Sequence, residues 1–253
     1  LSAVSDGLTY TSPVIVAGTF AILLNSFPLG FYQESMLSLF GPQWKLFGGY
    51  IYNGTFSVLS VIMALSIGHG LCEDHNSRHP LDRLTPSIFS FVIFSCVMAT
   101  MEPVAGGSAF ETRWLGVHGL LLAILTAVLS CYLFRFFLRF SWLRISMHSG
   151  SNSVAINQAL GTMFPVVLTI SIFAAYKAAM YFYGIPNPNE ALYKLLTHSF
   201  SSLGGQTLGA ASFYGFIRHF LWFFGIHGSN ALEPIMQEIY VSALSHNISL
   251  KEA

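Results

Sequence analysis

Four ionisable side chains near the end of the chain, Arg218, His219, His227 and Glu233, lie in or just beyond the apolar stretch TLGAASFYGFIRHFLWFFGIHG. An ionisable group in hydrocarbon costs on the order of a few kcal/mol, so its presence inside an apolar run marks a functional site. Neutral imidazole offers one donor and one acceptor, which suits a sugar hydroxyl, and the face of Trp222 can stack on a sugar ring. These residues therefore predict a ligand site.

The backbone around His227 is free to leave helical geometry, because Gly225 and Gly228 bracket this residue. Broken helical segments at membrane depth are tolerated only where they line a protein-enclosed or watery cavity, which is the setting of a transport site. A plainer interpretation stays open, in which His227 caps a helix end and Trp222 belongs to an aromatic belt at the membrane interface. The predicted binding residues are Arg218, His219, Trp222, Gly225, His227, Gly228, Asn230 and Glu233.

Composition indicates that these residues lie in a membrane protein. The chain has 253 residues, of which 53% are hydrophobic and only 9% charged, and its mean hydropathy is +0.60. An ordinary soluble domain has roughly 25% charged residues, so this chain has too few charges to coat a water-exposed surface. The formal net charge is zero and there is no long run of Lys or Arg, which excludes nucleic-acid binding.

The elements that must position the site are apolar helices. Several apolar runs approach or reach the roughly 20 residues that a helix needs to cross hydrocarbon. The sequence thus predicts an all-α, polytopic transmembrane fold with about six spans, of which the last is the interrupted or re-entrant stretch. Phe31–Asn53, rich in aromatic residues, is predicted to lie at the membrane interface. The predicted spans are residues 11–27, 55–72, 84–101, 114–134, 160–183 and 207–228.

Basic residues gather in alternate loops, which predicts the orientation. Retained cytoplasmic loops are enriched in Lys and Arg, and the loops after the second and fourth spans hold five arginines, whereas the opposite loops hold mainly three basic residues. A cytoplasmic N-terminus follows. The five are Arg78, Arg83, Arg135, Arg139 and Arg144, and the three are Lys45, Arg113 and Lys194.

Other reactive side chains receive structural interpretations. Cys72, Cys96 and Cys131 lack ligand spacing and are expected to be small buried residues. His69 and His118 are expected to pack or hydrogen-bond between helices, and Lys177 to extend its ammonium group to the membrane surface. The chain has no G-x-S-x-G, H-E-x-x-H, P-loop or G-x-G-x-x-G motif, so we expect no catalytic residue, no metal and no cofactor.

Four segments resemble one family of membrane proteins. WFFGIHG at residues 222–228 is the most specific, and SDGLTYTSPVIVAGTFAILL, GTFSVLSVIMALSIGHGL and RWLGVHGLLLAILTAVLS support it. Together they resemble the membrane-spanning enzyme IIC of the phosphoenolpyruvate-dependent sugar phosphotransferase system, in its lactose, cellobiose and chitobiose branch. The opening LSAVSDGLTY lacks the features of a signal peptide, and the chain reads as part of something longer.

The resemblance implies a homodimer in the bacterial inner membrane, with ten helices in each protomer. It implies that the His of GIHG, here His227, contacts a disaccharide or β-glucoside that a cytoplasmic enzyme IIB then phosphorylates. The chain would be the N-terminal half to two-thirds of such a permease, without the later Asn-Glu-Pro element. Its expected parts are a membrane interface domain at residues 1–160, a fifth span and connection at 161–188, and the incomplete start of a transport domain at 189–253.

One segment departs from the family pattern. The family reads R-I-S-M-P-x-G-V-P-P-A-V after the fourth span, whereas this chain keeps RISM at 144–147 and has His148, Asn152 and Ser153 in place of the prolines. Loss of rigid turn residues motivates an alternative, a degenerate enzyme IIC-like sensory domain of a bacterial signalling protein such as a cyclic di-GMP phosphodiesterase. A scaffold without a ligand is a third hypothesis.

Overall fold

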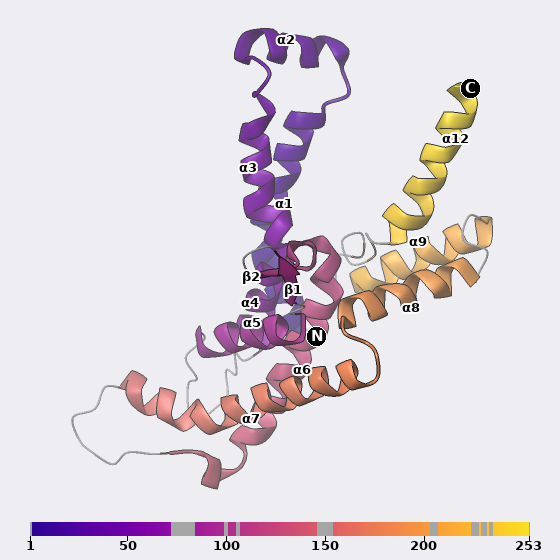
Figure 1. Cartoon of the computed structure of the whole chain (residues 1–253). Helices are drawn as coiled ribbons and strands as arrows, with labels where there is room; N and C mark the ends of the chain where they lie inside the picture. Colours follow the sequence, from indigo (N-terminus) through magenta and orange to yellow (C-terminus); the bar gives the residue numbers. More distant parts are fainter. Residues whose placement is uncertain are drawn as a thin grey trace.

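A computed structural model describes residues 2–71, 84–98, 101–104, 107–145, 154–202, 207–223, 228, 232 and 235–252. The predicted helical class is confirmed (Figure 1). The helices are α1 (Ser2–Ser26), α2 (Gly30–Phe40), α3 (Lys45–Thr55), α4 (Leu59–Leu71), α5 (Leu84–Met98), α6 (Leu120–Leu138), α7 (Val154–Phe182), α8 (Pro188–Ser202), α9 (Leu208–Phe223) and α12 (Ser242–Glu252). Short 3₁₀ turns cover Phe56–Val58, Thr112–Leu115, Val117–Gly119 and Ser141–Leu143, and a π-helical segment, η5, covers Met236–Val241.

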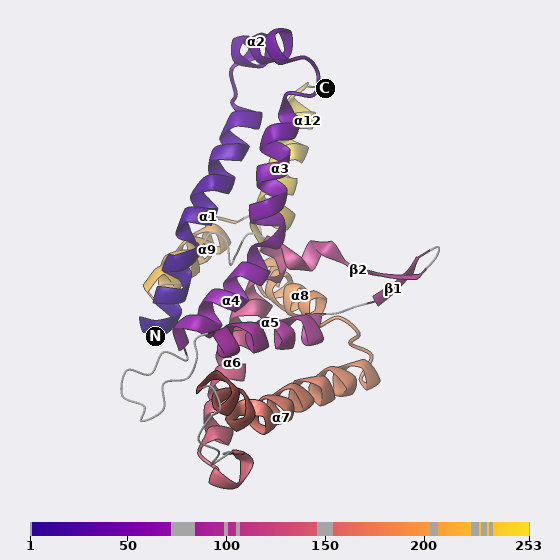
Figure 2. The ribbon, with the colours of Figure 1, turned by 90° about the vertical axis from the view of Figure 1, so that its left-hand side faces the viewer.

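The first three helices form a tall arm. Helices α1 and α3 run side by side, and α2 lies crosswise over their far ends (Figures 1 and 2). The chain bends by 92° between α1 and α2, and the break contains Pro28, which cannot continue a helical hydrogen-bond ladder. Tyr32 Oη donates to the Leu24 carbonyl at 3.0 Å across this corner. No residue of α2 is buried, as expected for a segment at the membrane interface.

The second half of the predicted interfacial segment belongs to a span instead. A helical stretch runs without interruption from Lys45 to Leu71, so it begins ten residues before the predicted start at Thr55. The glycines in this stretch favour a loop by propensity, but packing overrides them. Asn25 Nδ2 donates to the Lys45 carbonyl at 2.9 Å, and Gly48 packs so closely on the Asn25 side chain that a Cβ would lie 2.4 Å from its Oδ1 atom.

Three helices in the described part of the chain are long and apolar enough to cross a membrane, and the bent α1–α2 pair makes a fourth. The three are Lys45–Leu71, Val117–Leu138 and Ala159–Phe182. The predicted third span, described as α5, has 15 residues and covers about 22 Å at 1.5 Å per residue, short of the roughly 30 Å hydrocarbon layer. Of the last predicted span, the structure describes α9, which has 16 residues. The chain is a multi-pass membrane protein, and its described residues contain fewer full-length spans than expected.

The first hydrophobic core joins α4, α5, α6 and α7. Phe94, Ile67 and Phe134 are wholly excluded from solvent in it, and Phe173 contributes from α7. Many large apolar side chains elsewhere are exposed, including Phe20 on α1 and Phe182 on α7. This distribution suits a bundle whose outer surface faces lipid, because hydrocarbon favours such side chains as much as a core does.

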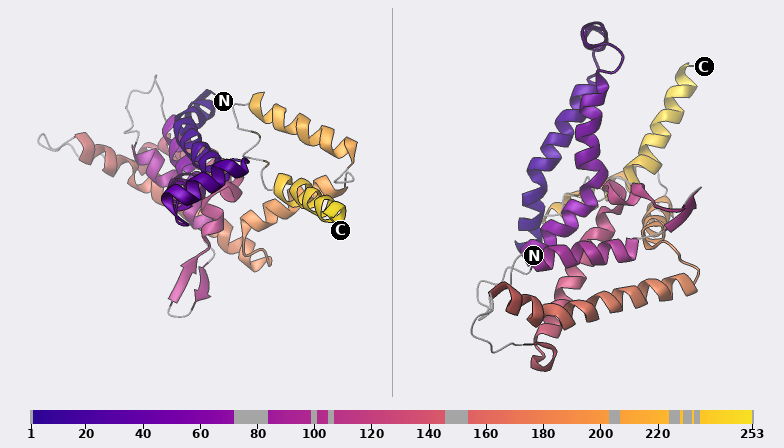
Figure 3. Two further views of the ribbon diagram at one scale, coloured as in Figure 1. Left: turned by 90° about the horizontal axis from the view of Figure 1, so that it is seen from above. Right: turned by 60° about the vertical axis from the view of Figure 1, so that its left-hand side comes forward.

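A β-hairpin departs from the all-α prediction. Strand β1 (Met101–Val104) pairs antiparallel with β2 (Gly107–Phe110), with Met101 opposite Phe110. The hairpin projects away from the helices (Figures 2 and 3). Strands this short leave no periodic sequence signal, and Pro103 within the segment argues against a strand by propensity. The hairpin is followed by the 3₁₀ turn at Thr112–Leu115, which packs on the first core through Trp114.

Two glycines of the WLGVHG segment allow the start of α6 to pack closely on neighbouring backbone. A Cβ on Gly119 would lie 1.9 Å from the Trp114 carbonyl oxygen, and a Cβ on Gly116 would lie 2.9 Å from the Phe56 carbonyl oxygen. The Ser60 hydroxyl donates to the Gly116 carbonyl. These contacts explain why the segment has glycine at both positions.

Gly119→Ala is expected to destabilise the protein, because the added methyl group overlaps backbone rather than a movable side chain. Overpacking of this kind costs about 1–3 kcal/mol, which lowers the melting temperature by roughly 2–10 °C. Gly49→Ala is the matched control, since no atom lies within 4 Å of its Cβ position and alanine favours a helix. Thermal melting of the detergent-solubilised protein would measure both. Equal melting of the two variants would contradict the close packing at Gly119.

The last part of the chain forms a second, smaller core. Phe200 of α8 packs with Leu232, Ile235 and Ile239, and partly buried residues of α9 join them. Helix α12 extends from η5 away from this core (Figures 1 and 3). The functions expected for the two parts, a membrane interface and the start of a transport domain, stay predictions.

Candidate functional site

The chain returns to α9 at Gly228, the second glycine of GIHG. Gly228 is buried, and a Cβ there would lie 2.0 Å from the carbonyl oxygen of Arg218. Backbone therefore lies directly against backbone, which only glycine permits. The close approach at Gly228 is to the α9 backbone, and its predicted role in binding a ligand stays a prediction.

Gly228 also begins the connection to the second core. Its carbonyl oxygen accepts from the Leu232 amide at 3.0 Å, and the Leu232 carbonyl accepts from Met236 at 3.1 Å. Leu232 and Ile235 are both buried in the second core. Gly228 is thus held between α9 on one side and the second core on the other.

Arg218 and His219 are exposed on α9. His219 Nδ1 lies 2.7 Å from the Gly215 carbonyl oxygen one turn earlier. A carbonyl only accepts, so Nδ1 carries a proton, and in a neutral ring Nε2 is left as an acceptor. Both side chains can therefore present hydrogen-bonding groups on the outside of α9.

The other predicted site residues cannot be placed in the same way. The backbone of Trp222 belongs to the last turn of α9. Gly225, His227, Asn230 and Glu233 lie outside the described residues, as do His148, Asn152 and Ser153 of the departing segment. Among the predicted site residues, the structure brings Gly228 and Arg218 into contact, and the binding roles of the whole set stay predictions.

A layer of aromatic rings beside this region was not predicted from sequence. Tyr214 of α9 lies 5.4 Å from Tyr240 of η5 and 6.1 Å from Phe200 of α8, measured between ring centroids. The Tyr240 hydroxyl is buried without a hydrogen-bond partner among the described residues, and this burial raises the pKa of Tyr240. The amphipathic pattern after Asn230 gave no sign of an inward-facing tyrosine, because the π-helical geometry of η5 shifts the helical period.

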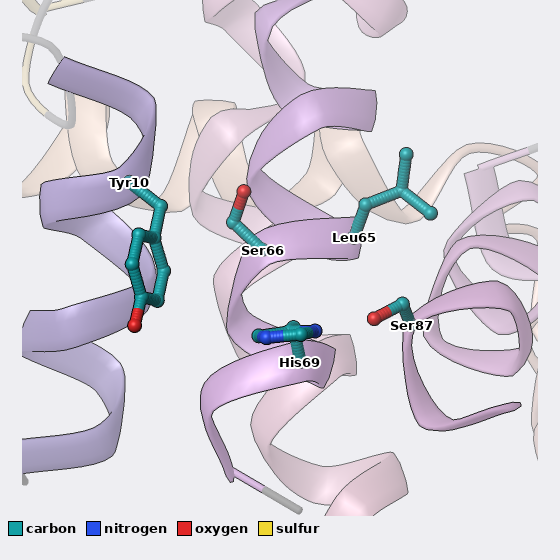
Figure 4. A pocket seen from close by; sticks show the side chains of 5 residues that line it. All are labelled: Tyr10, Leu65, Ser66, His69 and Ser87. Carbon is teal, nitrogen blue, oxygen red and sulfur yellow. The ribbon is translucent and has the colours of Figure 1, made fainter. Parts of the chain in front are cut away.

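A pocket of about 260 Å³ lies in the first bundle, between α1, α4 and α5 (Figure 4). His69 and Tyr10 meet there edge to face, with ring centroids 6.0 Å apart, so the interhelical packing role predicted for His69 is confirmed. The pocket is open, and Tyr10 is 57% exposed. Its other lining residues are Leu65, Ser66 and Ser87.

Two further predictions can be compared with the structure. Lys177 extends toward the end of α7, where Nζ donates to the Pro186 carbonyl at 2.7 Å, which confirms that its stem carries the ammonium group away from mid-helix. Cys131 is buried, whereas Cys96 is only partly buried, so the expectation of small buried thiols holds fully for Cys131.

Known proteins with sequences similar to this chain are membrane components of sugar phosphotransferase systems. The lichenan permease IIC component of Bacillus subtilis is 25% identical over 98% of this chain and 55% of its own length. The lactose-specific EIICB component of Staphylococcus haemolyticus is 26% identical over 100% of this chain and 42% of its own length. The chain therefore spans about half the length of the curated relatives it matches.

A solved structure shares the fold. The crystal structure of the transporter ChbC, the IIC component from an N,N'-diacetylchitobiose-specific phosphotransferase system, matches with a TM-score of 0.69 and 24% identity. The match covers 95% of this chain and 56% of that one. The family model for the phosphotransferase system EIIC matches residues 5–253, which confirms the resemblance drawn from WFFGIHG and its companion segments. This chain belongs to the phosphotransferase system EIIC family.

Proposed function

We propose that this chain is the N-terminal part of a sugar permease, which takes up a β-linked disaccharide such as cellobiose, chitobiose or lactose across the bacterial inner membrane. The observation that carries the proposal is the contact of Gly228 with the Arg218 carbonyl, within a chain matched by the EIIC family over residues 5–253. This contact fixes one end of the GIHG segment against α9. His227 then lies one residue from a rigidly held backbone position.

The chemistry of the site suits a neutral sugar. His227 can donate and accept a hydrogen bond, Trp222 offers an aromatic face, and Asn230 adds an amide. Arg218, His219 and Glu233 supply further polar groups in the same 16-residue stretch, 218–233. The names of the relatives support this ligand class, since they refer to lichenan, lactose and N,N'-diacetylchitobiose.

The proposal includes two protein partners. A cytoplasmic enzyme IIB would phosphorylate the sugar, because this chain shows no catalytic motif of its own, and a relative that carries the name EIICB supports such a partnership. A second copy of the protein would complete a homodimer. The N-terminus would lie in the cytoplasm, as the arginine-rich alternate loops predict.

Sugar-dependent thermal stabilisation of the purified full-length protein tests the ligand class. A ligand that binds only the folded state stabilises it by about 2.7 kcal/mol at a concentration of 100 Kd, so a cognate disaccharide is expected to raise the melting temperature by several degrees. Cellobiose, chitobiose and lactose form the test panel, and sucrose, which lacks a β-glycosidic link between two pyranoses, is the control. A melting temperature that no β-linked sugar changes would overturn the proposal and favour the degenerate sensory domain.

A further inference from the structure

The Glu111 side chain joins the two parts of the molecule. Its Oε2 atom accepts a hydrogen bond from Trp114 Nε1 at 2.6 Å. The same oxygen accepts a longer hydrogen bond, 3.5 Å, from Asn187 Nδ2, which lies 76 residues further along the chain. Glu111 follows the β-hairpin directly, and Asn187 directly precedes α8, so one carboxyl group links two connections that are remote in sequence.

On one side, Glu111 is held by the first core. Trp114 is 3% exposed and belongs to that core, and the Arg113 guanidinium lies 5.0 Å from the centre of its ring. The indole N–H of a buried tryptophan needs an acceptor, and the Glu111 carboxyl provides it. The position of Glu111 is therefore fixed relative to α4, α5 and α6.

On the other side, Asn187 holds the beginning of α8. Its Oδ1 atom accepts from the amides of Asn189, at 3.0 Å, and Glu190, at 3.4 Å, which satisfies free N–H groups in the first turn. Because backbone amides only donate, the Asn187 oxygen must face the helix and its NH₂ group must face Glu111. Lys177 holds the preceding Pro186 carbonyl, so the connection is fixed at two successive residues.

Movement at this connection would reach the candidate site through α8. Phe200, on the same helix, packs with Leu232 and Ile235, which follow Gly228. It also lies 5.6 Å from Phe213 of α9, measured between ring centroids. The start of α8 therefore sets where the second core, and Gly228 bonded to it, lie relative to the first core.

We infer that Glu111 is a positioning residue for sugar translocation. Through Asn187 it holds α8, and with α8 the candidate site, in a fixed position relative to the first core. The inference rests on the proposed function. Both hydrogen bonds that the structure gives Glu111 go to residues outside the predicted sugar-binding set, so disturbing its contact with Asn187 should change the rate of uptake and leave sugar affinity unchanged. The burial of Asn187 and Asn189, at 6% and 3% exposed, indicates that this contact is kept closed.

Asn187→Asp isolates the contact, because aspartate caps a helix as well as asparagine does but cannot donate to Glu111. Two carboxyl groups then face each other. In vesicle uptake with full-length protein, maximal velocity is expected to fall about tenfold, the factor that corresponds to one hydrogen bond of ordinary strength, with KM unchanged. Asn247→Asp, which adds the same charge at an exposed position on α12, is the matched control and should transport normally.

Adding Glu111→Gln to Asn187→Asp should rescue transport. Both native hydrogen bonds end on Oε2, so the new amide group must rotate to keep its oxygen on Trp114 and to turn its NH₂ group toward the introduced carboxyl group. Uptake by the double variant is expected within about twofold of E111Q alone, a range well inside the tenfold loss that one hydrogen bond represents. Unchanged uptake in N187D, or a double variant no faster than N187D, would overturn the inference.

Two measurements keep the inference separate from the proposed function. Sugar-dependent melting of the wild-type protein tests the function, so an absent shift would refute the permease and not this contact. Melting without sugar tests the contact itself, since E111Q should restore stability that N187D has lost. If N187D does not fold, recovery of folded protein in the double variant supports the inference, and failure to recover overturns it.

Discussion

His227→Ala is expected to weaken sugar binding by roughly 10- to 100-fold, because a sugar hydroxyl that loses its partner in a closed site costs about 1–3 kcal/mol. Isothermal titration of the full-length protein with the sugar that gives the largest thermal shift would measure the change in Kd. The melting temperature without sugar should stay near that of the wild type, since the substitution removes a side chain and leaves the glycines on both sides in place.

Two variants sharpen this test. His227→Gln keeps one donor and one acceptor, so it should recover part of the affinity. His198→Ala, at an exposed position on α8, is the matched control and should bind as the wild type does. If H227A bound the sugar with wild-type affinity while folded, His227 would be a helix cap or an interface residue, as the plainer interpretation of the sequence holds.

Gly228→Ala is expected to lower both sugar affinity and stability, unlike H227A, because it changes the backbone that carries the site. The new Cβ would lie 2.0 Å from the Arg218 carbonyl oxygen and 2.8 Å from its carbonyl carbon, and neither can rotate away. Moving α9 away from Gly228 would disturb the second core through Leu232. We expect sugar affinity to fall at least about tenfold and the melting temperature to fall as well, since overpacking costs about 1–3 kcal/mol.

Gly215→Ala on the same helix provides the comparison. No atom lies within 4 Å of its Cβ position, and alanine favours a helix by about 1 kcal/mol over glycine, so this variant should bind sugar normally and melt no lower than the wild type. Thermal melting and titration of both variants in the same detergent would separate packing from a general intolerance of α9. Normal sugar binding by G228A would show that the contact with Arg218 does not support the site.

The long apolar helices were predictable because their signal is local. A run of apolar residues long enough to cross hydrocarbon specifies its own helix, and α6 and α7 lie close to where the sequence indicates. The start of the second span at Lys45 was missed, because it depends on Asn25 bonding to the Lys45 carbonyl. Such a contact joins two helices through space, and no single window of sequence contains it.

The candidate site shows the same difference between local signals, which the sequence reveals, and contacts through space, which it does not. Arg218 and His219 are conspicuous as charged or polar residues in an apolar run, and the structure places both on α9. The glycines around His227 indicated an unusual backbone, but the close packing of Gly228 on Arg218 was not predicted. No role was predicted for Glu111, because a single acidic residue in a loop resembles an ordinary surface charge. Its contact with Asn187 is visible only in the fold.

The separation of the two hydrophobic cores has a consequence for how the protein is made. Among the described residues, the first core is complete once Phe173 has emerged from the ribosome, and the second uses only residues from Phe200 onward. Because domains of a growing chain fold in order of synthesis, the first bundle can assemble in the membrane before the residues of the proposed sugar site have been added. Damage to the GIHG region should therefore yield an inserted protein that is inactive, whereas damage near Gly119 should weaken the first bundle while the chain is still growing and make it more open to proteolysis.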